Sequence, residues 1–483
     1  MNPIMMIDGY KLDHRRQYPE GTEVVYSNFT PRMSRIPDQG KVTFVGLQYF
    51  LRKYLMEEFG EKFFGQDIDK ICERYERRVN GYLGPNEIGT EHIRELHELG
   101  YIPLTFRAVP EGTSVDLRFP FFTVENTHPN FAWLVNYFET LLSSVLWMPC
   151  TSATTASRYR ALLEDFAEKT GSAQEFVDFQ GHDFSFRGLP GPEAAALSGM
   201  GHLTYFKGTD TLPAIDLIED YYGGDFIGAS VPATEHSVMC AGGADDERET
   251  YERLLALYPK GILSVVSDTW DYFSVLTDLL PSIKDKIMAR DGKLVIRPDS
   301  GDPVKIICGD PNAPEGSPEY KGTVEVLWEI FGGTETATGH KLLDSHIGVI
   351  YGDSITYERC SAILAGLEAK GFASANMVFG IGSFTYQFTT RDTYGMAMKA
   401  TWVQINGEGK NIFKDPVTDG GFKKSAKGRL AVVEDEFGNN VLINEATITQ
   451  EDKSILRQVW ADGRFFIEDD WDTITARAKA GLR

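Results

Sequence analysis

Seven short apolar runs between residues 175 and 382 each end in polar residues with chemically capable side chains. Helical patterns fill most of the gaps between the runs, and strands that alternate with helices predict a parallel sheet. The fifth run, 294–296, shows the pattern plainly because Arg297, Asp299 and Asp302 follow it. Such residues at the carboxyl ends of strands are typical of active sites in βα-barrels and open α/β sheets. The predicted strands are 176–179, 203–206, 227–231, 262–266, 294–296, 347–351 and 377–379.

The segments on either side of this alternating part have a different pattern. Residues 1–130 mix helical runs with short strands, and residues 384–483 return to strands and hairpins, one of them turning at Asn406-Gly407. The fold class that follows is α/β. We expect an irregular βα-barrel of about seven parallel strands at 131–383. We expect a discontinuous α+β domain built from 1–130 plus 384–483.

Composition limits the classes of partner and the cellular compartment. The net charge of −22 repels nucleic acid and anionic membranes, so neither is expected as a partner. Five scattered cysteines without a CxxC pair argue against a disulfide scaffold or a zinc site and fit a reducing cytoplasm. The apolar stretch at 4–7 is too short for a secretion signal, and 131–148 has the spacing of a core helix. We therefore expect a cytoplasmic protein.

The first three strand ends carry an aromatic slot, a carboxylate and an acid–base pair. Phe184 beside Arg187 suits a flat ring next to a charged group, although a core position is equally compatible with it. Asp210 could bind a ligand or cap the helix that follows. Glu235 and His236 are candidates for acid–base or covalent chemistry, although a single histidine is more often structural.

The remaining strand ends suggest a phosphorylated, hydroxylated ligand. Arg297 offers paired donors, and Asp299 can bind hydroxyls or Mg²⁺. Asp268 and Asp353 could be ligand-binding carboxylates or helix caps. The glycine-rich segment 380–383 can expose backbone N–H groups to phosphate. Basic residues follow it in an otherwise acidic chain, namely Arg391, Lys399, Lys414 and the cluster 423–429.

Several enzyme classes are not supported by the motifs. The chain has no GxSxG nucleophile elbow, no Walker loop and no HExxH pair. The residues at the strand ends best serve transfer at a phosphorylated sugar, with Mg²⁺ held through carboxylates and phosphates.

Ten sequence stretches, in order and with similar spacing, resemble the nicotinamide phosphoribosyltransferase family over nearly the whole chain. They are DGYKLDHRRQYP from Asp8, GLQYFLRKYL from Gly46, HDFSFRG from His182, FKGTDT from Phe206, SVPATEHS from Ser230, SVVSDTWD from Ser264, VIRPDSGDP from Val295, VIYGDSI from Val349, NIFKDPVTD from Asn411 and KGRL from Lys427.

The resemblance implies synthesis of nicotinamide mononucleotide and pyrophosphate from nicotinamide and phosphoribosyl pyrophosphate. It also implies a homodimer whose two active sites lie at the subunit interface. Phe184 would stack on the pyridine ring, with Tyr10 of the second subunit on the other face. Asp210 would accept the carboxamide N–H₂ and repel the negative charge of nicotinate. Ser264 and Arg297 would complete this pocket.

The same resemblance assigns the sugar and phosphate contacts. The ribose side would be held by Asp299, Gly352 and Asp353, and the 5′-phosphate by Gly382, Ser383, Arg187 and Arg391. Arg32, Lys399, Lys414 and Lys423 of the second subunit would contact pyrophosphate, ATP or the Mg²⁺ complex. Mg²⁺ would be bound mainly through pyrophosphate, with no direct protein ligand.

His236 matches the family's phosphorylated histidine, so facultative coupling to ATP hydrolysis is expected. Glu235 and Asp268 would orient its imidazole, and carboxylates such as Asp299 would stabilise the oxocarbenium-like state. This chain departs from the usual family pattern at 185–186, where the family has Gly-Tyr, and also at Ser383 and Ala397.

Three other functions remain as alternatives. Nicotinate specificity is disfavoured by Asp210. A sugar-phosphate lyase or isomerase would need a catalytic lysine or a buried acid–base pair at a strand end. A non-catalytic nucleotide-binding regulator is disfavoured because Asp210, His236 and Arg297 are all present.

Overall fold

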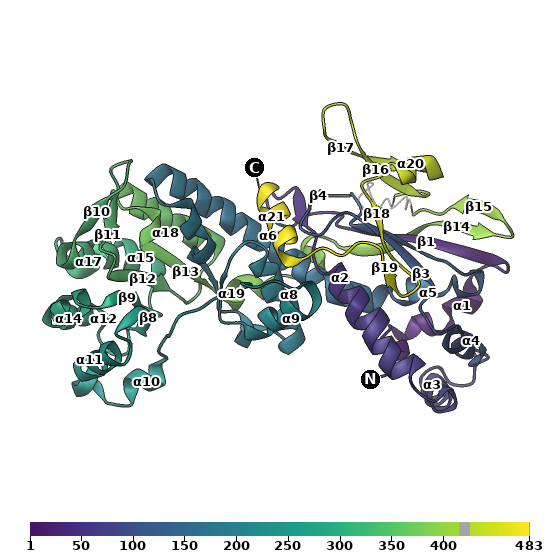
Figure 1. Ribbon diagram of the computed structural model, residues 1–483, viewed down its shortest axis with the longest axis horizontal. Helices are drawn as coiled ribbons and strands as arrows, with labels where there is room; N and C mark the ends of the chain where they lie inside the picture. The colour runs from purple at the N-terminus through teal and green to yellow at the C-terminus, as the bar shows by residue number, and fades with distance from the viewer. Residues whose placement is uncertain (415–425, 483) are drawn as a thin grey trace. The chain divides into compact units, whose positions relative to one another are not determined.

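The structure is a computed structural model that describes residues 1–414 and 426–482. The chain forms two compact units (Figure 1). Unit 1 contains Met1–Thr154, Ile218–Gly224 and Thr390–Arg483, so it combines both ends of the chain. Unit 2 contains Thr155–Leu217 and Asp225–Thr389.

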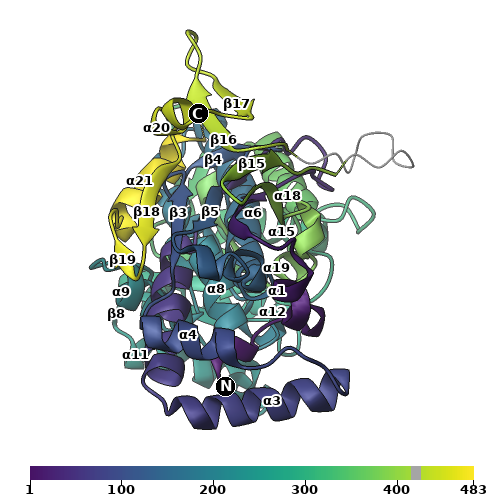
Figure 2. The same cartoon turned by 90° about the vertical axis from the view of Figure 1, so that its right-hand side faces the viewer.

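A seven-stranded antiparallel sheet forms the centre of unit 1 and joins strands from both ends of the chain. Figure 2 shows β18 beside β3 and β5 in this sheet. At one edge the β14–β15 hairpin turns at Asn406-Gly407, as predicted, and both residues have positive φ. The strand order is β15 (Glu408–Asn411), β14 (Ala397–Ile405), β1 (Thr22–Thr30), β5 (Phe122–Asn126), β3 (Leu104–Ala108), β18 (Arg457–Ala461) and β19 (Arg464–Phe465).

Helices and two small two-stranded sheets complete unit 1. The small sheets pair β2 (Lys41–Thr43) with β4 (Ser114–Asp116), and β16 (Leu430–Glu434) with β17 (Asn440–Asn444). The main helices are α2 (Leu47–Phe50) with its continuation Leu51–Glu58, α3 (Ile68–Leu83), α4 (Glu91–Leu99), α5 (Leu134–Tyr137), α20 (Ile448–Asp452) and α21 (Trp471–Ala480). The long helix α6 (Glu139–Thr170) begins in unit 1 and continues into unit 2. Over the described ranges, no helix has the length and apolar character needed to span a membrane.

Six parallel strands form the sheet of unit 2, with helices such as α14 (Lys284–Met288), α17 (Thr323–Phe331) and α18 (Tyr357–Ala369) around them (Figure 1). Ala229 bridges Gly208 at one edge of this sheet, and Ala233 bridges Ser264 at the other. The segment that contains these two alanines therefore lies between the two edge strands and closes the curled sheet into a barrel. The strand order is β7 (Gly208–Thr209), β6 (Gly181–Asp183), β13 (Met377–Ile381), β12 (Ile347–Tyr351), β9 (Asp291–Arg297) and β8 (Lys260–Val266).

The predicted irregular βα-barrel fold is confirmed, and the last four predicted strands overlap β8, β9, β12 and β13. The third, 227–231, makes only single bridges, and Pro232 in the same segment has no N–H to extend a ladder. The first two predicted strands were placed too early. Residues 177–180 form helix α7 (Val177–Gln180), and Leu203 ends helix α8 (Pro192–Leu203).

The error at the first two strands has a physical cause. A short apolar run does not distinguish a helix from a strand, and the apolar residues here belong to the helices that precede β6 and β7. The strands themselves begin at glycines, Gly181 and Gly208. A Cβ at Gly181 would lie 2.9 Å from the Phe206 ring, so close packing explains the lack of an apolar side chain there.

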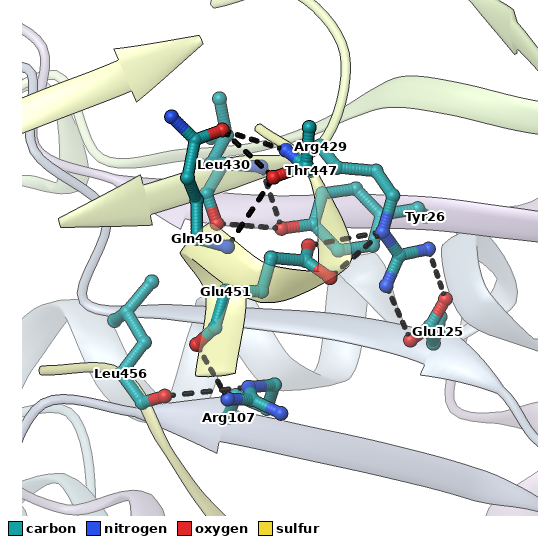
Figure 3. Close-up of polar contacts among 9 residues, drawn as sticks. All are labelled: Tyr26, Arg107, Glu125, Arg429, Leu430, Thr447, Gln450, Glu451 and Leu456. Atoms are coloured by element: carbon teal, nitrogen blue, oxygen red, sulfur yellow. Dashed lines mark hydrogen bonds and ion pairs between the residues drawn. The ribbon is translucent and has the colours of Figure 1, made fainter. Parts of the chain in front are cut away.

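Arg429 ties the C-terminal hairpin to the central sheet of unit 1 (Figure 3). Its two terminal nitrogens donate to both carboxylate oxygens of Glu125, at 2.7 and 2.8 Å. Its Nε donates to Glu451 at 2.9 Å, and the guanidinium lies 4.5 Å from the centre of the Tyr26 ring. The Tyr26 hydroxyl in turn accepts the backbone N–H of Leu430. One side chain thus joins β5, β1, β16 and α20.

We predict that Arg429→Ala destabilises unit 1 by about 3 kcal/mol, because it leaves the buried Glu451 carboxylate without its cation. Urea unfolding followed by tryptophan fluorescence measures this, since Trp402 lies beside the guanidinium. Arg94→Ala removes an exposed ion pair to Asp69 and serves as the control, with no measurable change expected. Equal losses in the two variants would contradict the role of Arg429.

Candidate active site

Two cavities in unit 2 share Phe184, Asp210 and Arg297 in their walls. One has a volume of about 390 Å³ and lies among the carboxyl ends of the strands. The other, about 370 Å³, has mainly apolar walls along the inner faces of β8, β9, β12 and β13. Residues from five predicted strand ends therefore gather at one place. Besides the three shared residues, the first cavity is lined by Phe186, Arg187, Gly188, Thr211, Asp299, Gly352, Asp353, Ser354, Gly382, Ser383 and Phe384.

The ring of Phe184 packs against two glycines. A Cβ at Gly380 would overlap the Phe184 ring, and a Cβ at Gly352 would lie 3.2 Å from it. The backbone N–H of Phe184 donates to Ile381 O at 3.0 Å, and the His182 ring lies 4.8 Å away between centroids. The aromatic face is therefore held in a fixed position at the point where the two cavities share walls.

Asp210 sits at this shared edge with its carboxylate already oriented. His182 Nε2 lies 2.9 Å from Asp210 Oδ1, and the Ser230 hydroxyl donates to the same oxygen at 2.6 Å. Burial alone would raise the pKa of Asp210. The hydrogen bonds and charge of His182, the Ser230 hydroxyl and the charge of Arg297 outweigh it and lower the pKa below its usual range. An ionised carboxylate accepts hydrogen bonds and repels anions.

Arg297 and Ser264 face the same region. Arg297 donates to Thr234 O at 2.6 Å, and its Nε lies 3.5 Å from Asp299 Oδ2. The Ser264 hydroxyl is buried in the wall of the apolar cavity and has no hydrogen-bond partner within residues 1–414 and 426–482. A buried polar atom without a partner is costly, so a polar ligand group would stabilise it.

Three carboxylates and a histidine cluster beside Arg297. His236 Nε2 lies 3.2 Å from Asp268 Oδ1, and Asp268 Oδ2 accepts the backbone N–H of Asp299 at 3.1 Å. Burial raises the pKa of Asp299, with Arg297 and His236 opposing the rise and Asp268 and Asp353 adding to it. In the described part of the chain Asp299 Oδ1 is buried and unpartnered. This end of the site is suited to hydroxyl groups and to developing positive charge.

Glu235 does not join this cluster through a hydrogen bond to His236. Its carboxylate accepts a hydrogen bond from the Ser237 hydroxyl instead. The imidazole of His236 is 49% exposed and is oriented by Asp268, whose side chain is 4% exposed. Of the two carboxylates predicted to orient this histidine, Asp268 makes the contact.

The turn after β13 approaches the loop that carries Arg187. A Cβ at Gly188 would overlap the Ser383 side chain, so the backbone of one segment packs directly against the side chain of the other. Gly382, Ser383 and Arg187 thereby line one end of the polar cavity, and Gly352 and Asp353 lie between that end and Asp299. The predicted ribose and phosphate residues of unit 2 thus line one cavity.

The other predicted residues belong to unit 1. Tyr10 is 60% exposed. Partial burial lowers the pKa of Lys399, Glu139 opposes this, and the charges of Arg32, Lys11 and Arg391 lower it further. Arg32, Lys399 and Arg391 therefore form a basic cluster within unit 1. Lys414 is also in unit 1, and Lys423 lies outside the described residues.

Sequence reasoning assigned no role to His182 and Ser230, the two partners of Asp210. His182 begins one of the matching motifs and Ser230 begins another. Neither motif indicates that side chains from β6 and from the segment around Ser230 meet at Asp210. In the described ranges, no three His, Cys, Asp or Glu side chains group as metal ligands.

The curled parallel barrel, with polar side chains gathered at the carboxyl ends of its strands, is the architecture of phosphoribosyltransferase-like proteins. Residues 179–464 match the nicotinate phosphoribosyltransferase (NAPRTase) family, and residues 2–99 match the nicotinamide phosphoribosyltransferase N-terminal domain. Among relatives, the nicotinamide phosphoribosyltransferase of Acinetobacter baylyi is 52% identical over 99% of this chain and 97% of its own length. The protein of the same name from Xanthomonas campestris pv. campestris is 33% identical over 99% and 98%. The chain belongs to the nicotinamide phosphoribosyltransferase family.

Two solved structures share the fold at 14% sequence identity. Nicotinate-nucleotide pyrophosphorylase from Pyrococcus furiosus has a TM-score of 0.61, with 100% of this chain and 95% of that chain covered. Human nicotinic acid phosphoribosyltransferase has a TM-score of 0.56, with 98% and 93% covered.

Proposed function

We propose that the protein transfers the phosphoribosyl group of phosphoribosyl pyrophosphate to nicotinamide, giving nicotinamide mononucleotide and pyrophosphate in NAD salvage. The observation that carries this proposal is Asp210, held ionised at the edge of the ring slot. His182 and Ser230 both bond to its Oδ1, so Oδ2 can accept the carboxamide N–H₂. The buried Ser264 hydroxyl, which has no partner among the described residues, is a second site for the amide.

The reaction forms a bond between the pyridine nitrogen and C1′ while the C1′–pyrophosphate bond breaks, and the leaving group takes the bonding electrons. Phe184 would fix the ring plane, and Gly382, Ser383 and Arg187 would fix the 5′-phosphate. Both reacting atoms would then be held in line, which supplies much of the rate enhancement in such reactions. Asp299 and Asp353, which both line the polar cavity, would lie beside the sugar where positive charge develops, and a fixed carboxylate stabilises such charge.

We propose that Mg²⁺ accompanies the pyrophosphate, since phosphate oxygens are among its preferred ligands. When bound, it would neutralise charge on the leaving group. Asp299 Oδ1, which has no partner in the described part of the chain, and Asp353 nearby fit contacts to its water shell. Arg32, Lys399 and Lys414 of the second subunit would hold pyrophosphate or ATP phosphates, and Lys423 is proposed for the same role from its sequence match. Arg391 would contact the 5′-phosphate.

We propose that the enzyme is a homodimer in which Tyr10 of a second subunit covers the ring bound on Phe184. The exposure of the Tyr10 ring supports this. We also propose that ATP phosphorylates His236, because Asp268 orients its ring and leaves it half exposed. The five free cysteines fit a cytoplasmic location.

The defining experiment incubates the protein with phosphoribosyl pyrophosphate, Mg²⁺ and either nicotinamide or nicotinate, and measures nucleotide formation. We expect turnover of nicotinamide. Turnover of nicotinate alone would make the protein a nicotinate phosphoribosyltransferase. No turnover of either base by a folded sample that binds nucleotide would make it a regulator.

A further inference from the structure

A buried histidine connects the two segments that the proposed function places at opposite ends of the product. His202, on α8, is fully buried. Its Nε2 lies 2.9 Å from the carbonyl oxygen of Gly208, two residues before Asp210. Its Nδ1 lies 2.7 Å from the hydroxyl of Tyr386, the last residue of α19 (Ser383–Tyr386).

The direction of both hydrogen bonds follows from the chemistry of the partners. A carbonyl oxygen only accepts, so Nε2 must carry the hydrogen. Burial lowers the pKa of His202 to about 4, with the charge of Asp183 opposing it, so the ring is neutral at pH 7. Nδ1 of a neutral ring protonated at Nε2 has a lone pair, and Tyr386 must therefore donate to it. One arrangement of hydrogens satisfies both bonds.

The packing around this pair leaves little freedom. The His202 ring stacks on Phe206 at 5.1 Å between centroids and lies edge-on to Tyr386 at 5.8 Å. The residue before Tyr386 is also held, because the Thr385 hydroxyl donates to Ile355 O at 2.8 Å. Thr385 therefore fixes α19 to the loop that follows β12. His202 links the same helix to β7.

We propose that His202 and Tyr386 are positioning residues that set the spacing between the carboxamide-binding segment at Asp210 and the phosphate-binding turn at Gly382 and Ser383. The inference rests on the proposed function, which places a ring amide at one segment and a phosphate at the other. A ligand that spans both segments binds tightly only when their spacing matches it, whereas a fragment that touches one segment is insensitive to the spacing.

The test compares three probes by titration calorimetry on the full-length protein, namely nicotinamide mononucleotide, nicotinamide and ribose 5-phosphate. Tyr386→Phe removes one oxygen and leaves Nδ1 of His202 without its donor. We expect affinity for the mononucleotide to fall about tenfold and affinity for each fragment to stay within about twofold. A role in stability alone would lower the unfolding temperature without this difference.

Tyr272→Phe is the matched control. Tyr272 is buried in the same unit, its hydroxyl lies 2.8 Å from Thr323 Oγ1, and neither residue lines either cavity. It should lose stability and keep its affinity for all three probes.

Two changes at His202 test the same pair if Tyr386→Phe does not fold. His202→Phe should show the same selective loss. His202→Gln, whose amide can still donate to Gly208 and accept from Tyr386, should recover most of the affinity for the mononucleotide.

Two outcomes would overturn the inference. One is unchanged affinity of Tyr386→Phe for the mononucleotide, and the other is an equal loss for the mononucleotide and for both fragments. A wild-type protein that binds neither nicotinamide nor its mononucleotide would instead refute the proposed function itself.

Discussion

Asp210→Ala is expected to lower kcat/KM for nicotinamide roughly 10- to 100-fold, the range for a lost hydrogen bond to a charged group. The change removes the ionised acceptor and also leaves the Nε2–H of His182 and the Ser230 hydroxyl without their shared partner. The residues proposed to bind phosphate, such as Gly382 and Ser383, line the polar cavity from a different strand end. Affinity for phosphoribosyl pyrophosphate, measured by calorimetry, should therefore change far less than nicotinamide use.

Asp210→Asn separates charge from shape at the same position. The asparagine side chain can still form a hydrogen bond with the carboxamide of nicotinamide, but it has no negative charge to repel the carboxylate of nicotinate. The ratio of nicotinate to nicotinamide use should therefore rise. Asp216→Ala, on α9 (Leu212–Tyr222) and outside the walls of both cavities, is the matched control and should leave both substrates unaffected. If Asp210→Ala weakens phosphoribosyl pyrophosphate binding as much as nicotinamide use, Asp210 is a structural residue.

The sequence was most informative where strands are long and apolar. The run 347–351 is buried throughout, and 262–266 is buried except for Ile262, so their apolar composition identifies them as parallel strands. Because carboxyl ends of parallel strands meet at one edge of a barrel, the same runs place Asp268, Arg297 and Asp353 near one another. The site could be outlined from the sequence for this reason.

Details set by register and close packing could not be read in the same way. The strand Gly181–Asp183 contains no aliphatic residue, since Phe206 packs where a side chain would start. The pairing of Asp210 with His182 and Ser230 depends on which residues face each other on neighbouring strands of the barrel. The hydrogen bond of Glu235 to Ser237 rather than to His236 is decided by local backbone geometry at the start of α10 (His236–Cys240).

His236→Ala is expected to abolish the stimulation of synthesis by ATP and the incorporation of acid-labile phosphate into the protein. A carboxylate only accepts hydrogen bonds, so Nε2 of His236 carries the hydrogen and donates to Asp268. Nδ1 then keeps its lone pair, which can attack phosphorus. The half-exposed ring can reach a nucleotide from solvent. Alanine removes the proposed nucleophile but leaves Phe184, Gly382 and Ser383 in place, so a nicotinamide-dependent rate should persist without ATP.

The matched control for this change is His346→Ala. His346 also pairs with a carboxylate, Asp344, at 2.7 Å, but it does not belong to the cluster of His236, Asp268 and Asp299. Its loss should leave both the ATP response and phosphate incorporation intact. Asp268→Asn should reduce incorporation without abolishing it, because the amide can still accept from Nε2 while no longer stabilising the positive charge that the imidazole gains on phosphorylation. An ATP response that survives His236→Ala would assign phosphate transfer to a different residue and reduce the contact between Asp268 and His236 to a structural one.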